Sequence, residues 1–265
     1  MQRPGAGTPK LMPKLWVMSD LHLEEVRHPD AYRPRCAGFD VLVVAGDVRH
    51  GGAQAVATVA RLAGGKPCVF VLGNHEPWHR ELGAERAAAR RAAARHGVTL
   101  LDDREATLAG VRFVGGTLWA DGRLGGQDGA PGQATGEMVR VAGEEGGTRP
   151  ITNGDEAILH ARTRGVIEAA LSGPGDGDGC PVVVVTHHAP HPLCVPAAHR
   201  ATWGAGNTAS DLSPLTDSGQ ISLWVHGHLH HSVDLVRPGG TRILCNPAGP
   251  RFGNAAFRDD LVVEV

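Results

Sequence analysis

The sequence predicts an α/β fold in which helices and mixed sheets are layered as a sandwich. Two observations carry this prediction. Short apolar runs of strand length alternate with helical segments in the first part of the chain, and later strands follow one another closely, as hairpins do. Because the apolar runs are continuous rather than alternating with polar residues, we expect strands that are buried on both faces.

The predicted strands are seven short runs rich in Val, Leu and Ile. They are LWVM at 15–18, VLVVA at 41–45, CVFVL at 68–72, VVVVT at 182–186, SLWV at 222–225, ILC at 243–245 and LVVEV at 261–265. Hairpin strands are expected within 107–115, 224–236 and 241–245. Each of the first five runs ends at a polar cluster that contains His, Asp or Asn, so these clusters are expected in loops at strand ends.

Helices are predicted over 53–63, 80–96, 155–171 and near 209–217. The helix over 80–96 illustrates the end signals. Glu81 and Glu85 stand at its start, Arg95 stands near its end, and Gly97 follows. Acidic residues at the N-terminus, a basic residue at the C-terminus and a glycine beyond it match the helix dipole and the usual C-cap.

Two Gly-rich stretches, 120–150 and 173–179, are predicted to be flexible loops. Strands resume on each side of both, and polar strand-end clusters occur in both halves of the chain. Neither stretch is therefore expected to be a domain boundary. We expect a flexible lead over 1–13 and one domain over 14–265.

Composition argues against several classes of protein. The chain has 265 residues, of which 42% are hydrophobic, and a net charge of -2. It can bury a core, and its charge gives no signal for nucleic acid or for an anionic membrane. With 4% aromatic residues it is poorly suited to stacking single-stranded bases, so nucleic acid is disfavoured without being excluded. No run approaches 18 apolar residues, so no membrane span is predicted.

The five cysteines are scattered and form no C-x-x-C pair, which predicts neither a disulfide framework nor a zinc ribbon. Cys68 and Cys245 lie inside apolar runs and are expected to be small buried hydrophobic residues. Reduced thiols suit a cytoplasmic protein.

Five strand-end clusters carry groups that bind metals. They are Asp20 and His22 in SDLHLE, Asp47 in GDV, Asn74 and His75 in GNHE, His187 and His188 in THHAP, and His226 and His228 in HGHLH. Ligands of an open α/β sheet bind beyond the carboxyl ends of its strands, so these residues are expected to meet there. Imidazole, carboxylate and amide oxygen without thiolate suit a catalytic divalent ion such as Mn, Fe or Zn.

In this order the five blocks resemble the signature of the calcineurin-like metallophosphoesterase superfamily, over residues 14–246, and CNPAG at 245–249 is similar to the end of small bacterial members. The resemblance implies a metallophosphatase-like, four-layer α-β-β-α sandwich of two mixed sheets flanked by helices. It also implies two divalent metal ions and hydrolysis of a small phosphodiester or phosphomonoester by a metal-bridging hydroxide. The block GDVRHGG departs from the protein phosphatase branch, which disfavours protein dephosphorylation.

The resemblance further implies seven metal ligands in two sets that share Asp47 as the bridge. The first set is Asp20, His22, Asp47 and His228. The second set is Asp47, Asn74, His187 and His226. His75 is implied to be the general acid for the leaving alkoxide, or a donor to a phosphate oxygen. The sequence does not identify a carboxylate that would orient His75.

Other polar residues have two interpretations. His188, His230 and His231 are expected to support ligands or lie exposed rather than bind metal. His191 and His199 either line a substrate pocket or belong to a mobile surface loop. Arg49 and His50 either contact phosphate or form a solvated loop pair. The arginines of the 80–96 helix, namely Arg86, Arg90, Arg91 and Arg95, are expected to form a solvated face rather than a nucleic-acid site.

Two alternatives to an active enzyme remain open. One is a scaffold that keeps the fold without catalysis, and the other is a structural or storage metal site that binds without turnover. The sequence fills every ligand position that the resemblance implies, which favours catalysis. Substrate identity, native metal and oligomeric state do not follow from the sequence.

Overall fold

The computed structural model describes residues 12–265 except 35, 37, 126–128 and 174–178. Most of the predicted lead over 1–13 and most of the Gly-rich stretch at 173–179 lie outside these described residues. All seven predicted strands form, each within one residue of its predicted bounds. Among the described helices, none combines the length and the apolarity that crossing a bilayer requires.

The first sheet has five strands. In spatial order they are β13 (Val262–Glu264), β1 (Lys14–Met18), β2 (Val41–Ala45), β3 (Cys68–Val71) and β4 (Thr99–Leu100). Strands β1 to β4 are parallel, and β13 joins β1 antiparallel. The parallel strands therefore release their polar loops at one end of the sheet.

The second sheet has six strands. In spatial order they are β11 (Val233–Val236), β12 (Arg242–Cys245), β10 (Leu223–His226), β9 (Val182–Thr186), β6 (Val111–Gly116) and β5 (Arg104–Leu108). The four central strands are parallel and both edge strands are antiparallel. Both sheets are thus mixed, as predicted. The expected hairpin over 224–236 is wrong, because β10 pairs in parallel with β12, and it is β11 that pairs antiparallel with β12.

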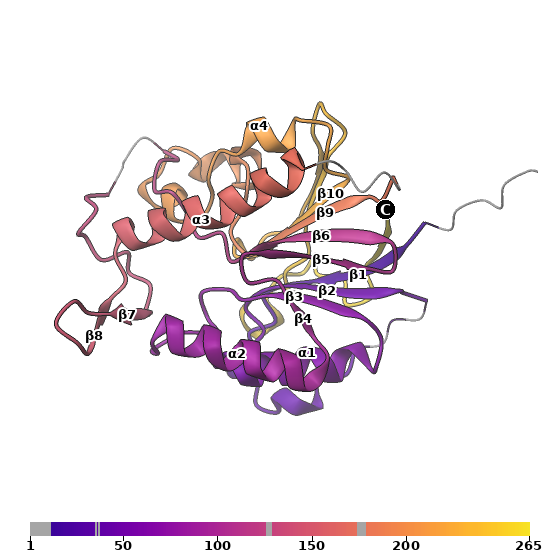
Figure 1. Ribbon diagram of the computed structural model, residues 1–265, viewed down its shortest axis with the longest axis horizontal. Coiled ribbons are helices and arrows are strands. Elements are labelled where there is room, and N and C mark those ends of the chain that lie inside the picture. Colours follow the sequence, from indigo (N-terminus) through magenta and orange to yellow (C-terminus); the bar gives the residue numbers. More distant parts are fainter. Residues whose placement is uncertain (1–11, 35, 37, 126–128, 174–178) are drawn as a thin grey trace, which may run out of the picture.

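The sheets face one another, with helices on both outer sides (Figure 1). Helices α1 (Gly52–Ala63) and α2 (Leu82–His96) cover the first sheet, and α3 (Asn153–Ser172) covers the second. Alternation along β1 shows the layering: Trp16 packs toward α1 and α2, whereas Val17 packs between the sheets. The predicted four-layer α-β-β-α sandwich is confirmed, and its strands are buried on both faces.

The helix ends follow the expected chemistry. The Glu81 carboxylate accepts hydrogen bonds from the first backbone N–H groups of α2, which ends at Gly97 with φ 69°. Thr152 and Asp155 form a reciprocal capping box at the start of α3. The helix expected near 209–217 is only one turn, α4 (Ser213–Thr216).

Within the Gly-rich stretch at 120–150, the residues that the structure describes, which leave out 126–128, are more ordered than predicted. It contains a two-stranded hairpin, β7 (Arg140–Ala142) and β8 (Thr148–Pro150), which projects beside the start of α2 at the left of Figure 1. Backbone bonds fasten this segment to the loop after β3: the N–H of His79 donates to Met138 O, and that of Arg140 donates to Arg80 O. The segment therefore borders the end of the sheet where the polar loops gather.

One more prediction is met, and another is met in part. Cys68 and Cys245 are buried in hydrophobic clusters. On α2, Arg86 forms ion pairs with Asp102 and Asp103, and Arg90 pairs with Asp102. Arg90, Arg91 and Arg95 lie on the exposed side of the helix, whereas Arg86 is largely shielded from solvent by its ion pairs. The expected solvated face therefore forms only in part.

Candidate metal centre

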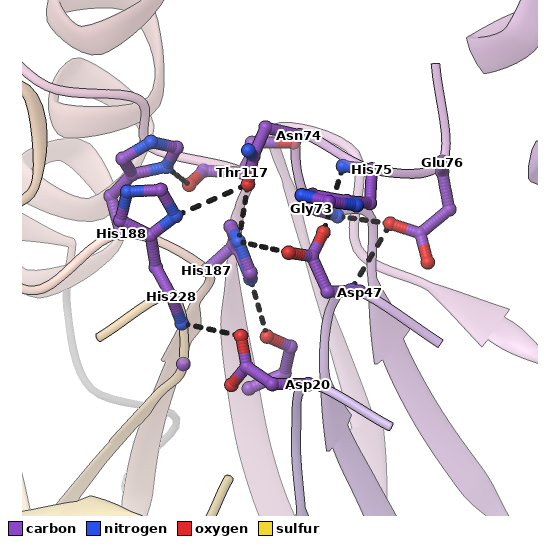
Figure 2. A network of polar contacts seen from close by, with 12 residues as sticks. Asp20, Asp47, Gly73, Asn74, His75, Glu76, Thr117, His187, His188 and His228 are labelled. Carbon is purple, nitrogen blue, oxygen red and sulfur yellow. Dashed lines mark hydrogen bonds and ion pairs between the residues drawn. The ribbon is translucent and has the colours of Figure 1, made fainter. Parts of the chain in front are cut away.

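The polar strand-end residues converge beyond the carboxyl ends of β1, β2, β3, β9 and β10 (Figure 2). Five of them have a left-handed backbone, which a side chain with Cβ rarely adopts. They are Asp20 (φ 52°), His22 (φ 42°), Asp47 (φ 53°), His228 (φ 70°) and His230 (φ 49°). Each such residue costs about 1–3 kcal/mol and persists where the surrounding structure requires it, which is typical of functional sites.

The first cluster consists of Asp20, His22, Asp47 and His230, whose potential ligand atoms all lie within 4.8 Å of one another. Nε2 of His22 lies 2.9 Å from Nε2 of His230 and 3.7 Å from Oδ2 of Asp47. Nε2 of His230 lies 3.6 Å from Oδ1 of Asp20. Two carboxylates and two imidazoles thus surround one point.

The second cluster consists of Asp47, His187 and His228, and the amide of Asn74 completes it. Nε2 of His187 lies 3.3 Å from Oδ2 of Asp47 and 2.8 Å from Oδ1 of Asn74. Nδ1 of His228 lies 3.1 Å from the same amide oxygen. One carboxylate, one amide oxygen and two imidazoles thus surround a second point, and Asp47 belongs to both clusters.

The donor atoms of these clusters fit a cation. Among the described residues, Oδ2 of Asp20 and Oδ2 of Asp47 are buried without a hydrogen-bond partner. Nδ1 of His187 donates to the carbonyl of Ala45 at 2.9 Å, so Nε2 of the neutral ring carries a lone pair. Lone pairs of His187, Asn74 and Asp47 therefore converge, and a cation among them would satisfy all three.

The electrostatics agree. Burial alone would lower the pKa of His187, but the charge of Asp47 more than offsets it and raises that pKa to about 10. Burial likewise works against ionisation of Asp47, yet the neighbouring imidazoles, His187 foremost, hold its pKa well below the usual range. The site therefore attracts positive charge, which a proton supplies on His187 when no metal ion does.

The geometry differs from the sequence prediction for His226, His228 and His230. His228 lies in the second cluster rather than the first, and His230 takes the expected place of His228. His226 belongs to neither cluster of described residues, and its Nδ1 donates to the carbonyl of Gly227 at 3.0 Å.

Strand alternation explains this. Val225 packs between the sheets, so its neighbours Trp224 and His226 project to the opposite face. The chain then turns at Gly227, where a Cβ would lie 2.6 Å from Oδ2 of Asp20. The sequence contained a signal for this arrangement. The GHLH block begins at Gly227, so its two histidines are His228 and His230, and His226 precedes the block.

Glu24 is the carboxylate beside His75 that the sequence did not identify. Its Oε1 lies 3.0 Å from Nδ1 of His22 and 3.3 Å from Nδ1 of His75. His22 thereby turns Nε2 toward the first cluster, a common arrangement for imidazole ligands of metals. Burial opposes the charge of Glu24, but its hydrogen bonds to these imidazoles dominate and lower its pKa to about 2.

His75 lies beside both clusters. Its ring stacks on Trp78, with centroids 4.3 Å apart and 15° between the planes. Burial would lower the pKa of His75, but the charges of Asp47 and Glu24 raise it to about 9. Because Nδ1 faces Glu24, Nε2 is the nitrogen left to face a substrate.

The carboxylate of Glu76 does not orient His75, although the two residues are adjacent in sequence. It connects the loop after β2 to the loop after β3. This buried carboxylate accepts hydrogen bonds from the backbone N–H groups of Gly73 at 2.6 Å, Val48 at 2.7 Å and Asp47 at 3.2 Å. It thus ties the loop after β3 to the loop after β2. Burial and the charge of Asp47 raise its pKa to about 7.

The remaining predicted candidates separate by burial. His188 is buried, and its ring lies against His228 at 4.2 Å, where burial lowers its pKa to about 3. It therefore supports a cluster residue. His191 is also buried and accepts a hydrogen bond from Leu193 N, whereas His199 and His231 are exposed.

The loop after β2 carries Arg49 and His50. Arg49 pairs with the exposed Asp30 at 3.3 Å. Nε2 of His50 lies 3.6 Å from Oε1 of Glu24, which brings this half-exposed ring to the edge of the site. Of the two residues, His50 is therefore the one associated with the cluster residues.

Comparisons with known proteins identify the family and the fold. The family model described as calcineurin-like phosphoesterase matches residues 13–232. Among solved structures, the chain is similar to phosphopantetheinyl hydrolase from Mycobacterium tuberculosis, with TM-score 0.72 and 20% identity over 96% of each chain. A dimetal phosphatase from Danio rerio is more distant, with TM-score 0.47 and 15% identity over 88% of this chain and 87% of that one.

A search of curated protein sequences finds no match. The structural likeness to the hydrolase supports the fold, and the family model covers most of the chain, including both histidines of the second cluster and His230 of the first. The protein belongs to the calcineurin-like phosphoesterase family.

Proposed function

We propose that this protein hydrolyses a small phosphodiester or phosphomonoester at a centre of two divalent metal ions. One observation carries the proposal. Oδ2 of Asp47 is buried without a hydrogen-bond partner among the described residues and lies 3.7 Å from Nε2 of His22 and 3.3 Å from Nε2 of His187. A single carboxylate oxygen between two groups of ligands is suited to bridging two cations.

The ligand sets follow from the two clusters. Asp20, His22, Asp47 and His230 would hold one ion, and Asp47, Asn74, His187 and His228 would hold the other. Nitrogen and oxygen ligands without thiolates suit Mn, Fe or Zn. Such ions, when bound, activate water near neutral pH and neutralise phosphoryl charge.

Two side chains, His75 and Glu24, would position and transfer the proton for the leaving group. His75 would donate from Nε2 to the leaving oxygen while Glu24 holds Nδ1. The pKa of about 9 describes the ring without bound cations. Two nearby cations would lower it toward neutrality, where a general acid works best.

The substrate is a phosphoester. The similar hydrolase is named for phosphopantetheinyl groups, which makes a phosphopantetheinyl ester a rational compound to assay beside simple esters. We also propose cytoplasmic action and manganese as the first metal to test.

The test combines metal analysis with turnover. We expect the purified protein to bind two metal ions and, with Mn supplied, to cleave bis-p-nitrophenyl phosphate or p-nitrophenyl phosphate. Absence of stoichiometric metal together with no cleavage of either ester would refute the proposal. If Asp47→Asn and His75→Ala both left the rate unchanged, the hydrolysis would come from a contaminant. Metal binding without turnover would instead identify a scaffold or a storage site.

A further inference from the structure

We infer that Glu137, on the Gly-rich segment, is a positioning residue that fixes the amide of Asn74 with its oxygen toward the second cluster. This inference rests on the proposed function, because it assumes that the second cluster binds a metal ion. It assigns a role to the Gly-rich segment at 120–150, which the sequence predicted to be a flexible loop.

The contacts of Asn74 are divided between its two amide atoms. Nδ2 donates a hydrogen bond to Oε2 of Glu137 at 2.8 Å. Oδ1 lies 2.8 Å from Nε2 of His187 and 3.1 Å from Nδ1 of His228. The nitrogen thus faces away from the cluster and the oxygen faces into it.

An asparagine amide has two orientations of nearly equal shape, but only one of them suits a cation. The oxygen has lone pairs for a metal ion, whereas the NH₂ group would repel it. Oε2 of Glu137 accepts a hydrogen bond from the NH₂ group, and a carboxylate oxygen at that position would repel the amide oxygen of the other orientation. The side chain of Glu137 therefore selects the orientation that leaves the oxygen for the metal.

The backbone around Glu137 is anchored on both sides. Its own N–H donates to Oγ1 of Thr135 at 3.3 Å, and the N–H of His79 donates to Met138 O. Val139, two residues after Glu137, is buried with Leu82, Trp119 and Ile151. The carboxylate is thus held from 63 residues away in sequence by a packed segment rather than by a free loop.

The position of the carboxylate also fits. The carboxylate of Glu137 lies behind the amide, on the side away from His187 and His228. Burial raises the pKa of Glu137, and the hydrogen bond from Asn74 opposes that rise. When Glu137 accepts a hydrogen bond from the NH₂ group of Asn74, the electron density on the amide oxygen increases, because linked hydrogen bonds polarise one another. A neutral ligand therefore becomes a better one without adding a carboxylate to the cluster.

The test measures metal content and affinity in three variants with the wild-type protein. Glu137→Met keeps the length and removes the acceptor, and Glu137→Gln keeps an acceptor without the charge. Glu145→Gln is the matched control, because Glu145 is exposed on the same segment. We expect Glu137→Met to weaken binding of the second ion by about 10–100-fold, Glu137→Gln by less, and the control to leave binding unchanged.

A second background separates positioning from simple support of the fold. In the Asn74→Asp variant the two carboxylate oxygens are equivalent, so no orientation has to be selected. There, Glu137→Met and Glu137→Gln are expected to leave the affinity for the second ion unchanged or to increase it, because a repulsive carboxylate is removed. If Glu137→Met folds poorly, the affinity for the second ion is compared between Glu137→Gln in the wild-type background and Glu137→Gln in the Asn74→Asp background.

The outcomes are distinguishable from those of the proposed function. If the wild-type protein binds two ions and Glu137→Met binds both with unchanged affinity, the positioning role is refuted while the metal centre stands. Equal losses in the Asn74 and Asn74→Asp backgrounds would refute it as well, because they would indicate general support of the fold. If the wild-type protein binds no metal, the proposed function itself fails.

Discussion

The two clusters share Asp47 but differ in how their ligands are held. The first adds a second carboxylate, Asp20, and its His22 is turned by Glu24, only two residues away in sequence. The second has a neutral amide in place of that carboxylate, and the orientation of the amide depends on Glu137. In the first site a carboxylate close in sequence orients one ligand, whereas in the second site a carboxylate from a distant segment does so.

This difference predicts unequal metal affinities. A unit charge about 4 Å from an ion contributes about 4 kcal/mol at an effective dielectric of about 20, before desolvation is subtracted. The extra carboxylate of the first cluster should thus bind its ion more tightly. The predictions below test or refine this comparison, from the largest expected effect to the smallest.

The largest effect is expected for Asp47→Asn, because both clusters lose their shared carboxylate. We expect loss of both ions and a fall of the phosphoesterase rate to background. Metal analysis after gel filtration and the rate with excess Mn measure this. Retention of two tightly bound ions would show that Asp47 does not bridge.

Stepwise removal of metal addresses the inequality itself. With increasing chelator, we expect one ion to leave first and the other to remain bound at least about tenfold more tightly, since the two sites differ by one carboxylate. In Asn74→Ala, only the tightly bound ion should remain, whereas in Asp20→Asn the tight class should disappear. Simultaneous loss of both ions in the wild-type protein would contradict the proposed difference.

His75→Ala should impair turnover without emptying either cluster. We expect kcat to fall by about 10²–10⁴-fold for an ester with a poor leaving group, the range for general acid catalysis. The loss should be much smaller for p-nitrophenolate, which leaves without a proton. Equal losses for both esters at full metal content would indicate that His75 instead binds the phosphate.

The smallest effect concerns the segment that borders the second cluster. Hydrogen bonds from Arg149 lower the pKa of Asp155 to about 2, below its ordinary value of 3.8. The stabilisation is present above about pH 4 and is lost as the pH falls toward 2. The pair is partly exposed to solvent, so we expect a modest loss of thermal stability for Asp155→Asn at pH 7, and a smaller difference from wild type at pH 3. A difference that grows on acidification would reverse the assigned sign.

The sequence predicted the layers and the strand ends well, because continuous apolar runs and polar clusters are local patterns. Pairing is not local, which is why β10 was expected to pair with β11 although β12 lies between them. Most cluster residues were predicted because they lie within a few residues of a strand end, whereas His230 was expected only to support ligands or lie exposed. His226 was predicted to be a ligand but lies in neither cluster, because strand alternation and the turn at Gly227 decide which imidazole faces the clusters.

The carboxylates that support the ligands were harder to predict. Glu24 was within the SDLHLE block, but its contact with His75 spans 51 residues, and Glu137 reaches Asn74 across 63 residues. With 28 acidic residues in the chain, no local pattern distinguishes these two. Their roles depend on how separate loops pack, which only the folded structure reveals.

The left-handed backbone at Asp20, His22, Asp47, His228 and His230 has a consequence for the abundance of the protein. At about 1–3 kcal/mol each, these conformations together are comparable to the whole net stability of a typical domain, about 5–15 kcal/mol. Metal binding to the native state would offset this cost in proportion to the logarithm of the free metal concentration. Metal supply is thus expected to govern how long the folded chain survives proteolysis, as well as how fast it works.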